Sequence, residues 1–169
     1  LLEVGRRGNT RTNLFGAHLG YAAHGLHLGL TAMYQSFNRQ FAPPKQEYKR
    51  YAPQGHDLFN ASIDYAWHHH RLSIVGETAI DKKGSVATLN TLRLKAADRL
   101  HFALLQRYYA RDFWALEGKS FGSSSDIRNE QGIYLGAEWR PHRRLLLTAY
   151  ADGYHFPFLR YRVSAPSYG

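Results

Sequence analysis

The feature that most constrains this chain is a two-residue alternation of side-chain type that recurs along most of its 169 residues. In segment 59–67, for example, apolar residues occupy the odd positions, and polar or small residues occupy the even ones. This period places successive side chains on opposite faces of a β-strand. The alternation is clear in segments 15–21, 26–35, 59–67, 133–140 and 145–152, and noisier in 72–80, 86–96 and 100–113. The sequence therefore predicts eight strands between residues 13 and 155.

The length of these segments narrows the fold class. Strands of soluble proteins average about five to six residues, whereas a tilted strand needs about nine to eleven residues to cross a bilayer. Tight connections at 22–25, 68–71, 97–99 and 140–143 alternate with 39–57, 82–84 and 115–131, two of which are long and polar. This rhythm is typical of barrels with short periplasmic turns and long outer loops. We expect an all-β protein, an antiparallel up-and-down transmembrane β-barrel.

The aromatic residues on the apolar face gather at the strand ends. Tyr21, Trp67 and Trp139 come just before tight turns, and Tyr34 and Phe59 lie at the opposite ends of their strands. Amphipathic rings prefer the lipid–water interface, so these five residues are predicted interfacial aromatics. The alternative is that Trp and Tyr simply favour strands.

The opposite face carries glycine and charges of both signs. Its predicted lumen polar network consists of Asp64, Glu77, Arg107, Glu138 and Asp152. Alternation alone would also fit a soluble barrel with a solvated outer face, but these strands contain almost no lysine. Because unpaired buried charge is costly, we interpret the charges as paired across a lumen rather than as an acid–base site. No Ser–His or Asp–His arrangement is apparent, so no catalytic residue is assigned.

The chain has a formal net charge of +9, and part of its basic excess is concentrated in the first long connection. Arg39, Lys45, Lys49 and Arg50 form a predicted anion-contact loop near Tyr48 and Tyr51. In an outer membrane its partners would be lipopolysaccharide phosphates and lipid headgroups. Basic residues interleaved with aromatics also bind nucleic acid, which we consider the less favoured partner of this segment.

Several classes of site are disfavoured. The absence of cysteine excludes disulfides and thiol chemistry, and no run of eighteen apolar residues predicts a membrane-spanning helix. In the run of histidines at 68–70 only His68 and His70 share a face, and a third metal ligand is missing. We therefore assign neither a metal nor a cofactor. Residues 1–6 resemble the end of another strand, so this single domain, 1–169, is expected to be part of a larger barrel.

Three segments carry a resemblance to a known family. Residues 107–122 (RYYARDFWALEGKSFG), 129–141 (NEQGIYLGAEWRP) and 151–169 (ADGYHFPFLRYRVSAPSYG) resemble the outer-membrane barrel region of Bacteroidota helix-hairpin-helix proteins, often labelled ComEA-like. The resemblance covers roughly residues 11–169 and implies a surface-localised outer-membrane protein. The helix-hairpin-helix part is not present, so DNA binding is not transferred to any residue here.

These patterns together favour a non-enzymatic protein of the bacterial outer membrane. It would serve as a channel, a scaffold or a component of a surface or transport assembly, with outer-membrane lipid, lipopolysaccharide and other outer-membrane proteins as partners. The first alternative is a soluble β-barrel binding module for nucleic acid or a hydrophobic ligand. An outer-membrane enzyme is the third possibility.

Overall fold

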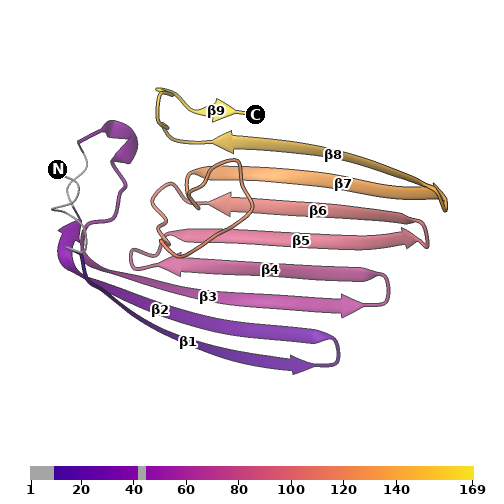
Figure 1. Ribbon diagram of the computed structural model, residues 1–169, viewed down its shortest axis with the longest axis horizontal. Coiled ribbons are helices and arrows are strands. Elements are labelled where there is room, and N and C mark those ends of the chain that lie inside the picture. The colour runs from indigo at the N-terminus through magenta and orange to yellow at the C-terminus, as the bar shows by residue number, and fades with distance from the viewer. Residues whose placement is uncertain (1–9, 42–44) are drawn as a thin grey trace.

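The structure, a computed structural model, describes residues 10–41 and 45–169. It is a single antiparallel sheet in which each strand pairs with the next along the chain (Figure 1). The strands are β1 (Thr12–Ala23), β2 (Leu26–Phe41), β3 (Gly55–His69), β4 (Leu72–Asp81), β5 (Val86–Ala97), β6 (Leu100–Tyr109), β7 (Glu130–His142), β8 (Leu145–Phe156) and β9 (Ser167–Tyr168). A 3-10 turn, η2 (Glu47–Lys49), interrupts the β2–β3 connection. Among the described residues, no helix has the length and apolar character needed to span a membrane.

The eight predicted strands and their up-and-down order are confirmed. The strand predicted for residues 100–113 is too long. Strand β6 ends at Tyr109, and a turn with a hydrogen bond from Phe113 N to Ala110 O follows it. The short β9 is additional, and two residues are too few to show a period. The segment predicted at residues 1–6 lies outside the described residues.

The described strands do not close into a barrel by themselves, and the expectation that they are part of a larger transmembrane barrel stays a prediction. In the described part of the chain, β1 and β9 form opposite ends of the strand order, and β9 pairs only with His155 and Phe156 of β8. Closure requires the last long strand to bond to the first, and Figure 1 shows β1 and β8 on opposite sides of the sheet. The structure is therefore an open nine-stranded sheet.

The two ends of the sheet have the predicted alternation of connections. Two-residue turns at 24–25, 70–71, 98–99 and 143–144 lie at one end, and the longer connections lie at the other, which we call the loop end (Figure 1). His24 and Gly25 both have positive φ, 51° and 80°. This is the backbone of a type I′ turn, whose twist matches that of the two flanking strands.

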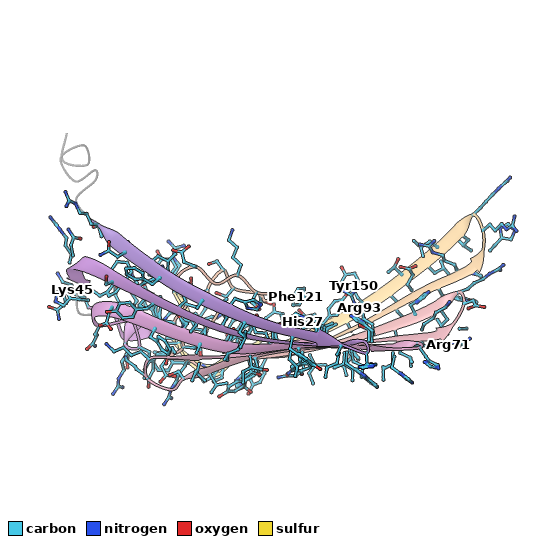
Figure 2. The ribbon with its side chains drawn as sticks, turned by 90° about the horizontal axis from the view of Figure 1, so that it is seen from below. His27, Lys45, Arg71, Arg93, Phe121 and Tyr150 are labelled. Atoms are coloured by element: carbon cyan, nitrogen blue, oxygen red, sulfur yellow. The ribbon has the colours of Figure 1, made fainter. Side chains whose placement is uncertain are left out.

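The sheet is curved, and its two faces differ in character (Figure 2). The connection of residues 110–129 lies on the concave side. Strand register places the buried strand residues other than glycine on this concave face: Gln35, Leu58, Asn60, Asp81, Ala87, Arg107, Tyr109, Glu130 and Phe156. The convex face exposes large apolar residues from every strand from β1 to β8: Phe15, Leu19, Tyr21, Leu28, Leu30, Tyr34, Phe59, Ile63, Ile80, Leu94, Phe102, Leu104, Tyr108, Ile133, Leu135, Trp139 and Leu147.

Candidate functional site

The connection between β6 and β7, residues 110–129, folds back over the concave face, and we call it the inner loop. Phe113 anchors it and is only 2% exposed, in a small cluster with Ala87 and Tyr109. Ala79 also packs against this cluster, and the small alanine side chains of β4 and β5 leave the space that the Phe113 ring fills. The loop is thus held against the sheet by burial of one aromatic residue.

A buried ion-pair network holds the part of the inner loop around Ser123 and Ser124. Arg107 Nε donates to Glu130 Oε1 at 2.6 Å, and its Nη1 donates to Asp152 Oδ1 at 2.7 Å. The side chains of Arg107 and Glu130 are fully buried. Glu130 also accepts hydrogen bonds from the backbone N–H groups of Ser123 at 2.9 Å and Ser124 at 3.2 Å. Because Arg107 compensates Glu130 and Glu130 binds loop amides, the network stabilises the loop.

A glycine makes room for this network. Gly132 of β7 lies opposite Arg107 of β6 in the strand register. A Cβ atom at position 132 would lie 2.6 Å from Arg107 Cζ. The guanidinium therefore lies directly over the backbone of the neighbouring strand, and a larger residue there would displace it.

Further hydrogen bonds attach the loop at three points. Tyr109 Oη lies 2.6 Å from both Ser120 Oγ and the carbonyl oxygen of Phe121. Asn60 Nδ2 donates to the Trp114 carbonyl at 2.8 Å, and Trp114 Nε1 donates to the Tyr51 carbonyl at 2.6 Å. These bonds connect the inner loop with β3, β6 and the β2–β3 connection.

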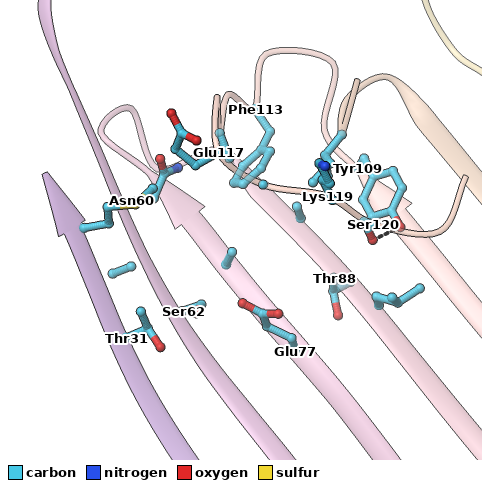
Figure 3. A pocket seen from close by; sticks show the side chains of 18 residues that line it. Thr31, Asn60, Ser62, Glu77, Thr88, Tyr109, Phe113, Glu117, Lys119 and Ser120 are labelled. Atoms are coloured by element: carbon cyan, nitrogen blue, oxygen red, sulfur yellow. Dashed lines mark hydrogen bonds between the residues drawn. The ribbon is translucent and has the colours of Figure 1, made fainter. Parts of the chain in front are cut away.

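The concave face and the inner loop enclose a cavity of about 270 Å³ (Figure 3). Glu77 lines it from β4, and Glu117 and Lys119 line it from the loop. Gln35 Nε2 donates to Glu117 Oε1 at 3.2 Å, while Gln35 Oε1 is buried and has no hydrogen-bond partner within the described part of the chain. Charges of both signs therefore line this cavity together with apolar side chains such as Met33, Leu89 and Ile127, a combination found in sites for small molecules.

The predicted lumen residues all lie on the concave face but do not form one network. Arg107 and Asp152 are brought together. Asp64 instead lies 3.4 Å from His27 Nε2, and Glu77 is its register partner on β4. Glu138 accepts from Arg140 Nε at 3.1 Å.

The sequence analysis missed Glu130, which lies in the predicted connection 115–131. The two-residue alternation of the following strand could have revealed it if extended toward the N-terminus, because Glu130, Gly132 and Tyr134 are two residues apart and share a face. Its position shortly after the Ser- and Gly-rich stretch 118–125 concealed that continuation.

The predicted interfacial aromatics all lie on the convex face. Tyr21, Trp67 and Trp139 are near the two-residue turns, and Tyr34 lies toward the loop end, opposite Phe59 in the register. Trp67 is partly covered because its ring stacks on His69, with 5.5 Å between ring centroids.

The predicted anion-contact residues lie at the loop end. Arg39 belongs to β2, because this strand continues to Phe41, so the predicted connection 39–57 begins too early. Lys45 and Arg50 are exposed beside η2, and Lys49 Nζ lies 5.6 Å from the Tyr48 ring centroid. His69 and His70 stack on each other, and the described ranges contain no group of three potential ligands placed to hold a metal.

A prediction concerns the attachment of the inner loop. Tyr109→Phe removes both hydrogen bonds of the phenol, which costs about 1 kcal/mol, or roughly a fivefold increase in loop opening. Tryptic cleavage after Lys119 should accelerate by this factor. The control is Tyr108→Phe on the convex face; equal acceleration in both variants would contradict the role of Tyr109.

The geometry defines a class of protein: an antiparallel, up-and-down β-sheet with an apolar convex face and a polar concave face beneath an inner loop. No family model, curated protein or solved structure matches the chain.

Proposed function

We propose that the chain forms part of the wall of a β-barrel in a bacterial outer membrane. The barrel is non-enzymatic and serves as a channel, a scaffold or a component of a surface or transport assembly. The observation that carries this proposal is the convex face, to which every strand from β1 to β8 contributes exposed large apolar side chains. A continuous apolar surface of this extent requires lipid or protein to cover it.

The distribution of polarity supports lipid as the covering. A soluble calyx has its apolar residues inside and its polar residues outside. In this sheet the polar and apolar sides are exchanged, because the ion pairs and the inner loop lie on the concave side (Figure 2). An apolar outside and a polar inside are typical of a membrane barrel.

The open edges add a requirement to the proposal. Backbone donors and acceptors exposed to hydrocarbon must be satisfied, so open sheet edges do not occur in lipid. The outer edge of β1 and most of that of β8 lack strand partners among the described residues. We propose that further strands, from the same or another polypeptide, complete a barrel larger than this sheet.

The inner loop gives the barrel its selectivity. Residues 110–129 would lie inside the lumen and narrow it beside Glu77, Glu117 and Lys119. Asp152 and Glu138 have cationic neighbours at Arg107 and Arg140, which favours ion pairing over catalysis at these two positions. The similarity to helix-hairpin-helix outer-membrane proteins remains part of this proposal.

The basic residues of the anion-contact loop are placed where they could bind phosphate groups of the outer leaflet. Arg39, Lys45, Lys49 and Arg50 lie at the loop end, where lipopolysaccharide and lipid headgroups would supply phosphate groups. We propose these lipids as partners, together with other outer-membrane proteins, and do not propose nucleic acid binding through this segment.

One observation favours the second candidate, a soluble β-barrel binding module for nucleic acid or a hydrophobic ligand. Five polar residues cluster on the convex face: Tyr65, Thr78, Thr88, Asn90 and Gln106. Tyr65 Oη donates to Asn90 Oδ1 at 2.7 Å, and Asn90 Nδ2 donates to Gln106 Oε1 at 2.7 Å. Because they hydrogen-bond one another, the cost of placing them against lipid is reduced, and the membrane proposal is retained.

Membrane extraction tests the proposal. The chain is expressed with an export signal, and outer membranes are washed with alkaline carbonate. We expect it to remain in the membrane pellet and to show heat-modifiable gel migration. A soluble, monodisperse product in the wash would overturn the proposal in favour of the soluble binding module.

A further inference from the structure

A second hollow lies at the loop end of the sheet, away from the cavity beneath the inner loop. It has a volume of about 420 Å³ and lies among η2, the two ends of the inner loop and the segment after β8. We call it the rim groove and define it by Lys49, Arg111, Arg128, Arg160, Phe158 and Tyr161. These residues come from three segments that are far apart in the sequence.

The rim groove carries a strong excess of positive charge. Among the described residues that line it, four are cations and one, Asp126, carries a carboxylate. Asp126 Oδ2 lies 3.4 Å from Arg128 Nε, and the Asp126 side chain is 53% exposed. Lys49, Arg111 and Arg160 form no salt bridge within the described ranges. The groove therefore attracts anions.

Aromatic rings position the three guanidinium groups. Arg111 Cζ lies 4.7 Å from the Tyr51 ring centroid, and Arg128 Cζ lies 4.4 Å from that of Trp114. Stacking orients a guanidinium while its N–H edge stays available for hydrogen bonds. Planar forks held in this way match the oxygens of a phosphate group.

Arg160 supplies an observation independent of the charge. Its Cζ lies 3.6 Å from the Phe156 ring centroid, and its Nη2 donates to Ser167 Oγ at 3.1 Å. Its Nε is buried and has no hydrogen-bond partner among the described residues. A buried donor without an acceptor is unfavourable, so a small shift of the Arg160 side chain that brings this N–H to a ligand oxygen in the groove would relieve that cost.

The remaining lining suits a sugar ring. Tyr48 and Tyr161 contact each other edge-to-face, with 5.8 Å between ring centroids, and Phe158 packs likewise on Tyr51 at 5.0 Å. These rings offer apolar surface beside the cations, as in small-molecule sites that combine aromatic walls with a few charged groups. The volume is sufficient for one phosphorylated sugar ring.

We propose that the rim groove binds a phosphorylated sugar, with the phosphate on the arginine side chains and the ring against the aromatic wall. The ligand is either a soluble sugar phosphate or the phosphorylated sugar headgroup of a lipid. The site is built only from residues at the loop end. It therefore stands whether or not the convex face contacts a membrane, and its test is separate from the extraction experiment.

Calorimetric titration of the purified chain tests the proposal, in detergent or buffer as its solubility requires. The probes are glucose 6-phosphate, glucose and inorganic phosphate. We expect saturable binding of glucose 6-phosphate, at least tenfold tighter than that of either fragment. Inorganic phosphate binding as tightly as glucose 6-phosphate would overturn the role of the aromatic wall, and the absence of saturable binding would overturn the site.

The variant Arg160→Gln should weaken glucose 6-phosphate binding at least tenfold. Arg93→Gln removes the same charge from an exposed position on the concave face (Figure 2) and should leave binding unchanged. If both variants lost affinity for glucose 6-phosphate equally, the effect would come from net charge alone, and the proposal would be overturned. Should Arg160→Gln lower the thermal unfolding midpoint of the free protein, Arg111→Gln replaces it with the same expectation.

Competition distinguishes the two sources of the ligand. Vesicles containing lipopolysaccharide are added to the complex with glucose 6-phosphate, and phosphatidylcholine vesicles serve as the control. Release by lipopolysaccharide alone identifies a lipid headgroup, and retention identifies a soluble sugar phosphate; both support the proposal. Equal release by both kinds of vesicle would show that the binding is not selective and would overturn it.

Discussion

Leu19→Arg is expected to lower the membrane-assembled fraction of this protein by about 30-fold or more, while His18→Arg leaves it near the wild-type level. Leu19 is 72% exposed on the convex face of β1, and His18 points to the concave face of the same strand. An arginine facing lipid near the bilayer midplane costs about 2–4 kcal/mol, and each 1.4 kcal/mol is a factor of about ten. The measurement is the heat-modifiable, carbonate-resistant fraction.

The two positions make a matched pair because they are neighbours that receive the same side chain. His18 Nδ1 lies 2.9 Å from Thr31 Oγ1 at an exposed site, so its loss is a small effect. Equal reductions in both variants would contradict the assignment of faces. Unchanged behaviour of Leu19→Arg would mean that the convex face does not contact lipid.

Arg107→Ala is expected to destabilise the folded chain by about 3–5 kcal/mol. The variant leaves the fully buried carboxylate of Glu130 without its cation, and an uncompensated buried charge is costly. The inner loop should open with it, because Glu130 binds the amides of Ser123 and Ser124. The denaturation midpoint reports the stability, and tryptic cleavage after Lys119 reports the loop.

The control and the rescue follow from the same argument. Arg140→Ala breaks the exposed ion pair with Glu138 and should cost less than about 1 kcal/mol. Adding Glu130→Gln to Arg107→Ala removes the unpaired charge and should restore part of the stability. A loss in Arg107→Ala no larger than that in Arg140→Ala would contradict the importance of the buried network.

The strand pattern could be predicted because it depends on local periodicity. Segment 59–67 alternates without interruption, and both of its faces are correct in the structure. Phe113 misled the prediction, because an apolar residue after Tyr109 resembles the continuation of a strand. Its burial depends on Ala79 and Ala87 of other strands, which a local pattern does not contain.

The candidate sites could be predicted only in part. Arg107 and Asp152 can be recognised in the sequence as charged residues on one strand face. The ion pair between Arg107 and Glu130, however, is buried by a loop that folds back over the sheet. The rim groove is even harder to predict from the sequence, because Tyr48, Arg128 and Arg160 are far apart along the chain and come together only in the folded structure. Closure of the barrel depends on edge partners, which the alternation within a strand does not specify.

The neighbour-only pairing of β1 to β8 also has a consequence for the order of folding. Every long strand pairs with the strand before or after it, so the sheet can grow one hairpin at a time with little loop-closure entropy at each step. The ion-pair network, however, spans β6, β7 and β8, because Asp152 lies one strand beyond Glu130. The inner loop therefore becomes fully fixed only after the third of these strands has docked, so its ordering is a late event that reports completion of this side of the sheet.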